Sequence, residues 1–464
     1  MTYTPYGAAR EVTGSKHLLE HQGDQVLLDC GLWQGRRQES RQRNSAWPFE
    51  PSKIKAVIIS HAHLDHVGML PILVRAGYRG PIYATPATRD IAELILLDAA
   101  HLQEQDADYA GRHGVTDMSL SKPIFGQADI APVMNLFKEI EIAKNCADWL
   151  QISNNFALQL HQAGHILGSA MVMIRPRGDD SAWLYTGDLG REHTPLLTDP
   201  HQPVTPVSHV ICESTYGNRI HHPIATVEKE LIEIIRSTVA NQAKILLPAF
   251  SLGRTQELIY LLHRLTDQLE IPRLPIVVDS PLAARITDVF THHQQEYDQE
   301  SHRDFSRPHE DPLVFRNLRF THNADESKAL NSAPGPLVII SASGMATGGR
   351  VMHHLRNLLP DPKANIIFTG YQADHTPGRR LLKGATAVQI FGELVPVRAQ
   401  IKSINDLSAH ADGQEIRSLL NHLVNLKNVF LVHGELDRAN DLRQAIITEH
   451  PDWQVTIPVN GQAY

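Results

Sequence analysis

Short apolar runs alternate along the chain with polar or glycine-containing turns and with helical patterns. Residues 25–31 (QVLLDCG) predict a strand and a turn, and residues 55–77 predict a strand, a histidine-rich loop and a helix. Residues 157–176 predict two strands around a loop, whereas residues 182–190 and 209–218 each predict a strand that ends in a polar turn. Short apolar runs bounded by turns are typical of buried strands, and helices between them favour a layered α/β architecture.

The middle of the chain repeats one kind of unit. Residues 244–265, 274–290, 336–359 and 364–384 each predict a strand, a turn and a helix. Units of this kind in series favour a parallel, doubly wound sheet. The last stretch, 400–464, returns to histidines near strand ends. Candidate metal ligands therefore lie early and late in the chain, around a ligand-poor block, which is typical of one domain inserted into another.

Composition is ordinary for a globular protein, and it excludes several classes. The chain has 464 residues, of which 42% are hydrophobic and 20% charged, so it is neither a disordered chain nor a coiled-coil rod. The formal net charge is −8. A protein that coats nucleic acid through a generally basic surface is therefore disfavoured. An anionic substrate stays open if positive charge is concentrated locally.

The cysteines and the apolar runs indicate where in the cell the protein is expected. Cys30, Cys146 and Cys212 are too few and too widely spaced for a disulfide framework, so we expect reduced thiols. The first residues contain no apolar core typical of a signal peptide. The longest apolar runs are far shorter than the roughly 18–20 residues that span a bilayer. We therefore expect a soluble, cytoplasmic protein without a membrane partner.

The sequence H-A-H-L-D-H places four potential metal ligands directly after a predicted strand. They are His61, His63, Asp65 and His66. Imidazole suits Zn²⁺, and a carboxylate can join it. Four ligands in six residues are too many for one tetrahedral ion with an open position, so the cluster indicates two ions. The alternative is a solvated polar loop, which is disfavoured because burying four such groups without a metal or partners is costly.

Three further residues follow predicted strands and could complete such a site. Taken singly, His165 in AGHILGS and Asp188 in YTGDLG are ordinary turn residues. Together with the cluster at 61–66, Asp188 is the natural carboxylate to bridge two ions, and His165 is a third ligand for the first ion. We interpret Asp29 in LLDCG as a carboxylate that orients a ligand histidine; the alternative is a turn-capping aspartate.

These residues, in this order, resemble the metallo-β-lactamase fold. Glu213 in CESTYG, His410 in LSAHAD and His433 in FLVHGE further resemble motifs A, B and C of the β-CASP nucleases. That family includes the endonuclease subunit of the eukaryotic pre-mRNA 3′-processing complex and related bacterial ribonucleases. The segments PAFSLGRTQEL, DSPLA, SASGMATGG and GYQADHTPGR resemble the domain that this family inserts. The resemblance covers essentially the whole chain.

The resemblance implies an α/β fold: a metallo-β-lactamase αββα sandwich with an inserted α/β β-CASP domain that contains a mainly parallel sheet. The implied segments are residues 1–213 for the first part of the metallo-β-lactamase domain, 214–395 for the β-CASP domain and 396–464 for the closing part.

The resemblance also implies two zinc ions per chain, and manganese could occupy the same nitrogen and oxygen ligands. The ligands implied for the first ion are His61, His63 and His165, and those for the second are Asp65, His66 and His433, with Asp188 between them. The residues implied in catalysis are Asp65, His410 as the general acid, and Glu213, which orients His410.

The Gly-rich turn at 341–349 precedes a helix, and backbone N–H groups at such a turn favour anions. The candidate phosphate contacts in it are Ser341, Ser343, Gly344 and Thr347. Arg254 and Arg379 are further candidates. The alternatives are an ordinary turn with helix-capping residues and solvated surface arginines. The adjacent histidine pairs 221–222, 292–293 and 353–354 are expected at the surface, because neighbouring side chains on a regular element diverge.

The implied function is zinc-dependent hydrolysis of phosphodiester bonds in single-stranded RNA, mainly at internal positions, with 5′-to-3′ trimming open. His433 favours RNA over DNA by family analogy. Three alternatives are a DNA nuclease, a hydrolase of small esters or lactams on the same fold, and an inactive RNA-processing subunit. No small organic cofactor is expected, and homo-oligomerisation is left open.

Overall fold

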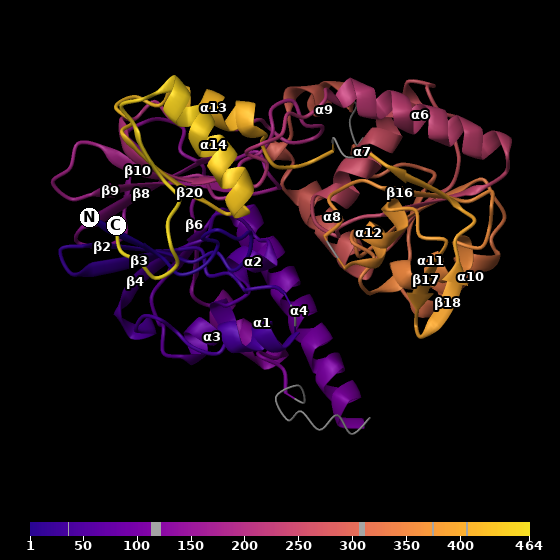
Figure 1. The fold of residues 1–464 in the computed structure, drawn as a ribbon, viewed down its shortest axis with the longest axis horizontal. Coiled ribbons are helices and arrows are strands. Elements are labelled where there is room, and N and C mark those ends of the chain that lie inside the picture. Colours follow the sequence, from indigo (N-terminus) through magenta and orange to yellow (C-terminus); the bar gives the residue numbers. More distant parts are fainter. Residues whose placement is uncertain (36, 113–121, 306–310, 374, 405–406) are drawn as a thin grey trace. The chain divides into compact units, whose positions relative to one another are not determined.

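A computed structural model describes residues 1–35, 37–112, 122–305, 311–373, 375–404 and 407–464 (Figure 1). The chain forms two compact units, which are described separately. The first unit contains Met1–Glu192, Asp199–Ile220 and His410–Tyr464, and the second contains His193–Thr198 and His221–Ala409. The domain boundaries expected after residues 213 and 395 stay predictions.

Two sheets face each other in the first unit. The first has the order β1 (Thr2–Pro5), β2 (His17–His21), β3 (Asp24–Leu28), β4 (Ile54–Ile58), β5 (Ile82–Ala84), β6 (Phe137–Glu139). The second has the order β21 (Gln454–Thr456), β20 (Asn428–Val432), β11 (Val207–Glu213), β10 (Ala182–Tyr185), β9 (Ala170–Pro176), β8 (Phe156–Gln162), β7 (Leu150–Gln151). Apolar side chains of both sheets, such as Ile58 and Val172, pack in one buried layer between them.

Helices cover the outer faces of this pair of sheets (Figure 1). Those on the side of the first sheet are α1 (Arg37–Arg43), α2 (Leu64–Val67), α3 (Leu70–Arg75), α4 (Pro86–Arg112) and α5 (Ile130–Met134), with short 3₁₀ turns at Pro51–Lys53 and Gln127–Asp129. On the other side, α13 (Gly413–His422) and α14 (Leu436–Glu449) bury Leu420 and Leu442 against the second sheet. The predicted αββα sandwich is confirmed.

The second unit is built on a six-stranded sheet in which every pair of neighbours is parallel. Its order is β14 (Leu318–Phe320), β13 (Ile276–Asp279), β15 (Leu337–Ser341), β12 (Lys244–Pro248), β16 (Asn365–Phe368), β19 (Gln400–Ser403). The helices are α6 (Ile224–Ala240), α7 (Arg254–Asp267), α8 (Pro281–His292), α9 (Gln299–Asp304), α10 (Ala324–Ser332), α11 (Arg350–Leu358) and α12 (Pro377–Leu382). A 3₁₀ turn at Gln294–Glu296 and the hairpin β17 (Ala387–Ile390) and β18 (Glu393–Pro396) complete the unit.

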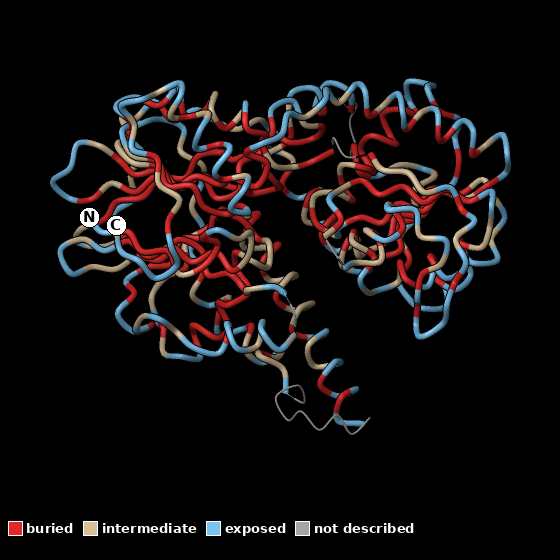
Figure 2. Tube along the Cα trace, in the orientation of Figure 1, coloured by how far each residue is buried: buried red, intermediate tan, exposed pale blue. Residues whose placement is uncertain are grey.

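The four predicted strand–turn–helix units are present as β12–α7, β13–α8, β15–α11 and β16–α12. The residues of β13, β15 and β16 are all buried, which explains their continuous apolar runs, since both faces of a parallel sheet are covered. Figure 2 shows these buried strands at the centre of the unit. In the described residues, we find no helix that is both long and apolar enough to cross a membrane.

Two local expectations can be compared with side-chain burial. All three cysteines are free thiols; Cys30 and Cys212 are buried, whereas Cys146 is exposed. The expectation that adjacent histidine pairs lie at the surface is wrong for His293 and His354, which are buried. His354 lies on the inward face of α11, where its Nε2 is 2.5 Å from the Asp279 carboxylate.

Candidate metal centre

Loops at one end of the two sheets of the first unit bring the predicted ligands together. His61 and His63 follow β4, and α2 carries Asp65 and His66, so that part of the expected loop is a short helix. The other groups come from loops that are distant in sequence: His165 lies between β8 and β9, Asp188 follows β10, Glu213 ends β11, His410 precedes α13 and His433 follows β20.

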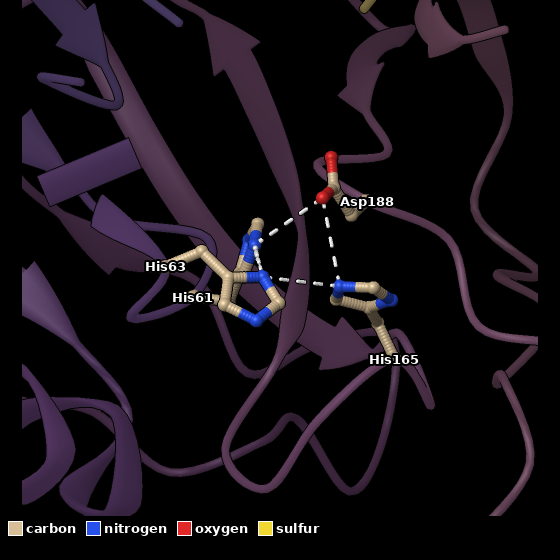
Figure 3. Close-up of side chains that lie close together, drawn as sticks. All are labelled: His61, His63, His165 and Asp188. Carbon is tan, nitrogen blue, oxygen red and sulfur yellow. Dashed lines mark hydrogen bonds and ion pairs between the residues drawn. The ribbon is translucent and has the colours of Figure 1, made fainter. Parts of the chain in front are cut away.

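The first group consists of His61, His63, His165 and Asp188 (Figure 3). His63 Nδ1 is 3.0 Å from His61 Nε2 and 3.3 Å from His165 Nε2. Asp188 Oδ2 is 3.4 Å from His61 Nε2 and 3.5 Å from His165 Nε2. A tetrahedral Zn²⁺ with bonds of roughly 2.0–2.1 Å separates its ligand atoms by about 3.3 Å. These residues therefore fit a zinc ion both in their spacing and in their chemistry.

The second group consists of Asp65, His66 and His433. His433 Nε2 is 3.2 Å from His66 Nε2 and 3.5 Å from Asp65 Oδ2. The other ring nitrogen of His433 is 3.1 Å from the hydroxyl of Thr215, which itself donates to the main-chain carbonyl of His433. The Nδ1–H of His433 therefore donates to Thr215, and this bond turns Nε2 toward the other two ligands.

Asp188 faces both groups with different oxygen atoms. Oδ2 belongs to the first group, whereas Oδ1 is 3.4 Å from His66 Nε2 and 3.5 Å from His433 Nδ1. Oδ1 is buried and accepts no hydrogen bond from the described part of the chain. A buried carboxylate oxygen without a donor is costly unless a cation satisfies it. This orphaned oxygen is the strongest sign, within the structure itself, that positive charge belongs between the two groups.

The protonation states of the first group suit metal binding. Burial lowers the pKa of His63 to about 3, and it also lowers the pKa of His61 and His165. These rings are therefore neutral at pH 7, and neutral imidazole is the form that binds a metal ion. Burial alone would raise the pKa of Asp188, but His433 and the other surrounding histidines outweigh it and hold the carboxylate ionised.

Beside this cluster, His410 pairs with Glu213. His410 Nδ1 is 3.1 Å from Glu213 Oε1, and the same oxygen accepts the backbone N–H of Leu189 at 2.6 Å. Burial disfavours the charged imidazole, but Glu213, together with Asp188 and Asp65, outweighs this effect and raises the pKa of His410 to about 9. His410 is therefore protonated at neutral pH, with Nε2 turned away from Glu213.

Comparison with known proteins agrees with this arrangement. Family models match at residues 11–235 (metallo-beta-lactamase superfamily), 255–381 (Beta-Casp domain) and 394–458 (Zn-dependent metallo-hydrolase RNA specificity domain). Ribonuclease TTHA0252 of Thermus thermophilus is 38% identical over 439 residues, which cover 94% of each chain. The chain belongs to the β-CASP ribonucleases of the metallo-β-lactamase superfamily. The family and the fold predicted from the motifs are confirmed.

More distant matches also span nearly the whole chain. Transcription termination factor FttA of Methanothermobacter thermautotrophicus is 31% identical over 96% of this chain and 68% of its own length. Endoribonuclease YSH1 of Eremothecium gossypii is 28% identical over 95% of this chain and 56% of its own length. Among solved structures, the chain resembles a protein of unknown function from Enterococcus faecalis V583 with a TM-score of 0.57 and 13% identity. The match covers 100% of this chain and 99% of that protein, and it shows the fold alone.

The predicted phosphate contacts of this β-CASP chain lie in the second unit. Ser341 is buried, and its hydroxyl donates to the main-chain carbonyl of Asp279. Ser343 and Thr347 are more accessible, with their hydroxyls 3.2 Å apart. Gly344 is buried between them.

The two predicted arginines differ in their surroundings. Arg254 forms an ion pair with Glu257 at 2.5 Å, and its side chain is 10% exposed. Arg379 is half-buried in α12.

Asp29 lies behind His66, with Oδ2 2.6 Å from His66 Nδ1, and its orienting role stays a prediction. Three residues that support the site were not identified from the sequence: Ser60, Tyr185 and Thr215. Each contacts a candidate ligand or Asp29 through a hydroxyl group. Only Tyr185 carried a usable signal, because it is a polar-tipped residue at the end of a buried strand, three positions before Asp188.

Proposed function

We propose that this chain hydrolyses phosphodiester bonds in single-stranded RNA, mainly at internal positions, with two zinc ions held by the two ligand groups. The observation that carries the proposal is the placement of Asp188, whose two oxygens face different sets of ligands while one of them accepts no hydrogen bond from the described chain. Manganese fits the same nitrogen and oxygen donors.

When bound, two such ions supply a nucleophile near neutral pH and neutralise charge on the phosphate. The remaining tasks fall to side chains. His410 donates a proton from Nε2 to the departing oxygen, since its Nδ1 is engaged by Glu213. Glu213 fixes the orientation of the ring and favours its charged form. Asp65 has the most exposed carboxylate of the site, with 21% of its side chain accessible. We therefore propose that it orients the attacking water in addition to serving as a metal ligand.

In the second unit, we assign a contact with a backbone phosphate to Ser343 and Thr347 together with the N–H groups of their turn, with Arg379 as a further contact. Ser341 and Gly344 shape this turn from buried positions. Arg254 is expected to contribute less to phosphate binding, because Glu257 already neutralises its charge. The relative named endoribonuclease and the RNA specificity domain matched at 394–458 support RNA as the substrate. Free thiols at all three cysteines favour the cytoplasm as the place of action.

One experiment separates the substrate classes. Labelled single-stranded RNA, DNA of the same sequence and a β-lactam are incubated with the protein, with and without a chelator. Chelator-sensitive cutting of RNA is expected, while turnover of the β-lactam alone or of DNA alone would overturn the proposal. A circular RNA in the same assay tests internal cutting, because it offers no end to an exonuclease.

A further inference from the structure

Asp29 is the point at which both candidate ligand groups are anchored. Its Oδ1 accepts the backbone N–H of Ser60 at 2.7 Å, and its Oδ2 accepts the Ser60 hydroxyl at 2.7 Å. Oδ2 also lies 2.6 Å from His66 Nδ1 and accepts the Tyr185 hydroxyl at 2.6 Å. Because the only proton of the Ser60 hydroxyl goes to Asp29, the His61 Nδ1 found 3.0 Å from Ser60 Oγ must donate to it. Asp29 therefore turns Nε2 of one histidine in each group toward the centre.

A line of polar side chains continues behind Asp29, away from the candidate metal centre. The Tyr185 hydroxyl is 3.0 Å from Ser15 Oγ, and Ser15 Oγ is 3.0 Å from His17 Nε2. His17 Nδ1 is in turn 3.0 Å from the Tyr3 hydroxyl. Tyr3, Ser15 and His17 come from the first sheet and the loop that precedes β2, whereas Tyr185 ends β10 of the second sheet. The line thus crosses between the two sheets.

Counting protons gives this line a single direction. Tyr185 has one hydroxyl proton, which goes to the Asp29 carboxylate, so Ser15 must donate to Tyr185. The hydroxyl proton of Ser15 is then used, so His17 Nε2–H must donate to Ser15. Burial lowers the pKa of His17 to about 3, so its ring is neutral and has a single N–H. Nδ1 is therefore an acceptor, and Tyr3 donates to it.

Every donor in the line points toward Asp29, so that each bond polarises the next in the same sense. The line is buried, so each of its polar groups needs a hydrogen-bond partner within the protein. Tyr3, Ser15, His17 and Asp29 are 0% exposed, and Tyr185 is 2% exposed. Tyr3 and Tyr185 belong to the apolar layer between the two sheets. A hydroxyl that lost its partner there would have no water to replace it.

We propose that Tyr185 is a positioning residue for the metal centre, which holds Asp29, and through it His61 and His66, in the orientation that binds metal. Ser15 and His17 support Tyr185 from behind. The backbone of Ser15 adds to this role, because its N–H donates to the carbonyl of Asp65 at 2.8 Å. The inference rests on the proposed zinc-binding function and extends it to residues that contact neither metal nor substrate.

The first test is the zinc affinity of Tyr185→Phe, measured by competition with a chromophoric chelator. We expect affinity to fall by about tenfold, the lower end of the loss seen when partners of ligand residues are removed. The visible absorption of the cobalt-loaded protein should shift as well, which a purely structural role would not produce. Tyr83→Phe is the matched control, because Tyr83 is a half-buried tyrosine of β5 outside the line. Unchanged zinc affinity and an unchanged cobalt spectrum in Tyr185→Phe would overturn the inference.

The second test uses the wild-type protein and so does not depend on the folding of a variant. Nitrogen-15 NMR of the His17 ring, assigned by comparison with His17→Gln, reports which nitrogen carries the proton. We expect the neutral Nε2–H form at pH 6–8, and the Nδ1–H form would overturn the direction of the line. Failure of the wild-type protein to bind zinc would instead overturn the proposed function, whatever the tautomer of His17.

Discussion

His410 Nδ1 lies 3.1 Å from Glu213 Oε1, and this contact favours the protonated form of the His410 ring. Glu213 is 0% exposed, so its charge acts on the ring with little screening from water. Leu189 fixes the same oxygen through its backbone N–H. The pair therefore holds one ionisable proton beside the candidate metal centre.

Removing the charge of Glu213 should move the alkaline limit of activity. Burial alone lowers the pKa of His410, but Glu213, with smaller contributions from Asp188 and Asp65, raises it to about 9, so the acid form persists up to that pH. In Glu213→Gln the strongest influence that favours the charged ring is lost and only the more weakly acting Asp188 and Asp65 still oppose burial, so the acid form should be lost at a lower pH. We expect the alkaline arm of the kcat profile for RNA cleavage to shift downward by at least one pH unit. Glu192→Gln, at an exposed position, is the control. An alkaline arm at the same pH in Glu213→Gln would contradict this role.

His410→Ala should separate catalysis from metal binding. The ring belongs to neither of the two groups that contain His63 or His66, so zinc content should stay at the wild-type value. Loss of a general acid costs typically 10²–10⁴-fold in rate, and we expect kcat to fall by about that factor. Zinc by mass spectrometry and single-turnover cleavage of labelled RNA measure the two quantities. Undiminished turnover would remove His410 from the mechanism.

Asp188→Ala should lose metal and activity together. The carboxylate faces both ligand groups, so its removal weakens both sites at once. We expect the zinc content after dialysis to fall below half of the wild-type value and RNA cleavage to fall with it. Asp180→Ala, in an exposed turn, should retain both. Full zinc content in Asp188→Ala would show that the carboxylate is not shared.

Replacing Asp279 should lower the stability of the second unit. This buried carboxylate accepts from Thr321, Ser327 and Arg350, and it pairs with His354. Asp279→Ala leaves these donors without their acceptor, and removal of one partner from a buried ion pair costs about 3–5 kcal/mol. We expect urea unfolding, followed by a probe in the second unit, to shift by that amount. Asp325→Ala, at an exposed position of α10, should unfold like the wild type.

The sequence could predict those parts of the site that are contiguous or attached to regular elements. His61, His63, Asp65 and His66 stand within six residues after a clear apolar strand, so their convergence needed little tertiary information. The strand–turn–helix units of the second unit were equally accessible, because buried parallel strands are continuous apolar runs. The grouping of His165 and Asp188 with them was inferred from their places after predicted strands, and that of His433 was implied by the family resemblance.

Side chains whose role depends on distant partners could not be predicted. The divergence of neighbouring side chains on a regular element predicts that His353 and His354 lie at the surface, yet His354 pairs with Asp279, which is 75 residues away in the sequence. Tyr185 and Ser15 are 170 residues apart, so the sequence around either residue does not show that they pair. Hydrogen-bond partners of this kind follow from the packing of a helix on a sheet or of one sheet on another, which no local pattern encodes.

Metal uptake should release protons, and the amount should depend on the second group of ligands. Burial disfavours the charged form of His66, but Asp188, Asp29 and Asp65 outweigh it and raise its pKa to about 10 in the metal-free protein. His66 must lose the proton on Nε2 to bind zinc, whereas His63, with a pKa of about 3, is already neutral. At pH 7 we therefore expect at least one proton released per chain on zinc uptake, and weaker zinc binding as the pH falls. Calorimetric titration of the metal-free protein in buffers of different ionisation enthalpy measures this number. A heat of binding independent of the buffer would show that His66 is already neutral before the metal arrives.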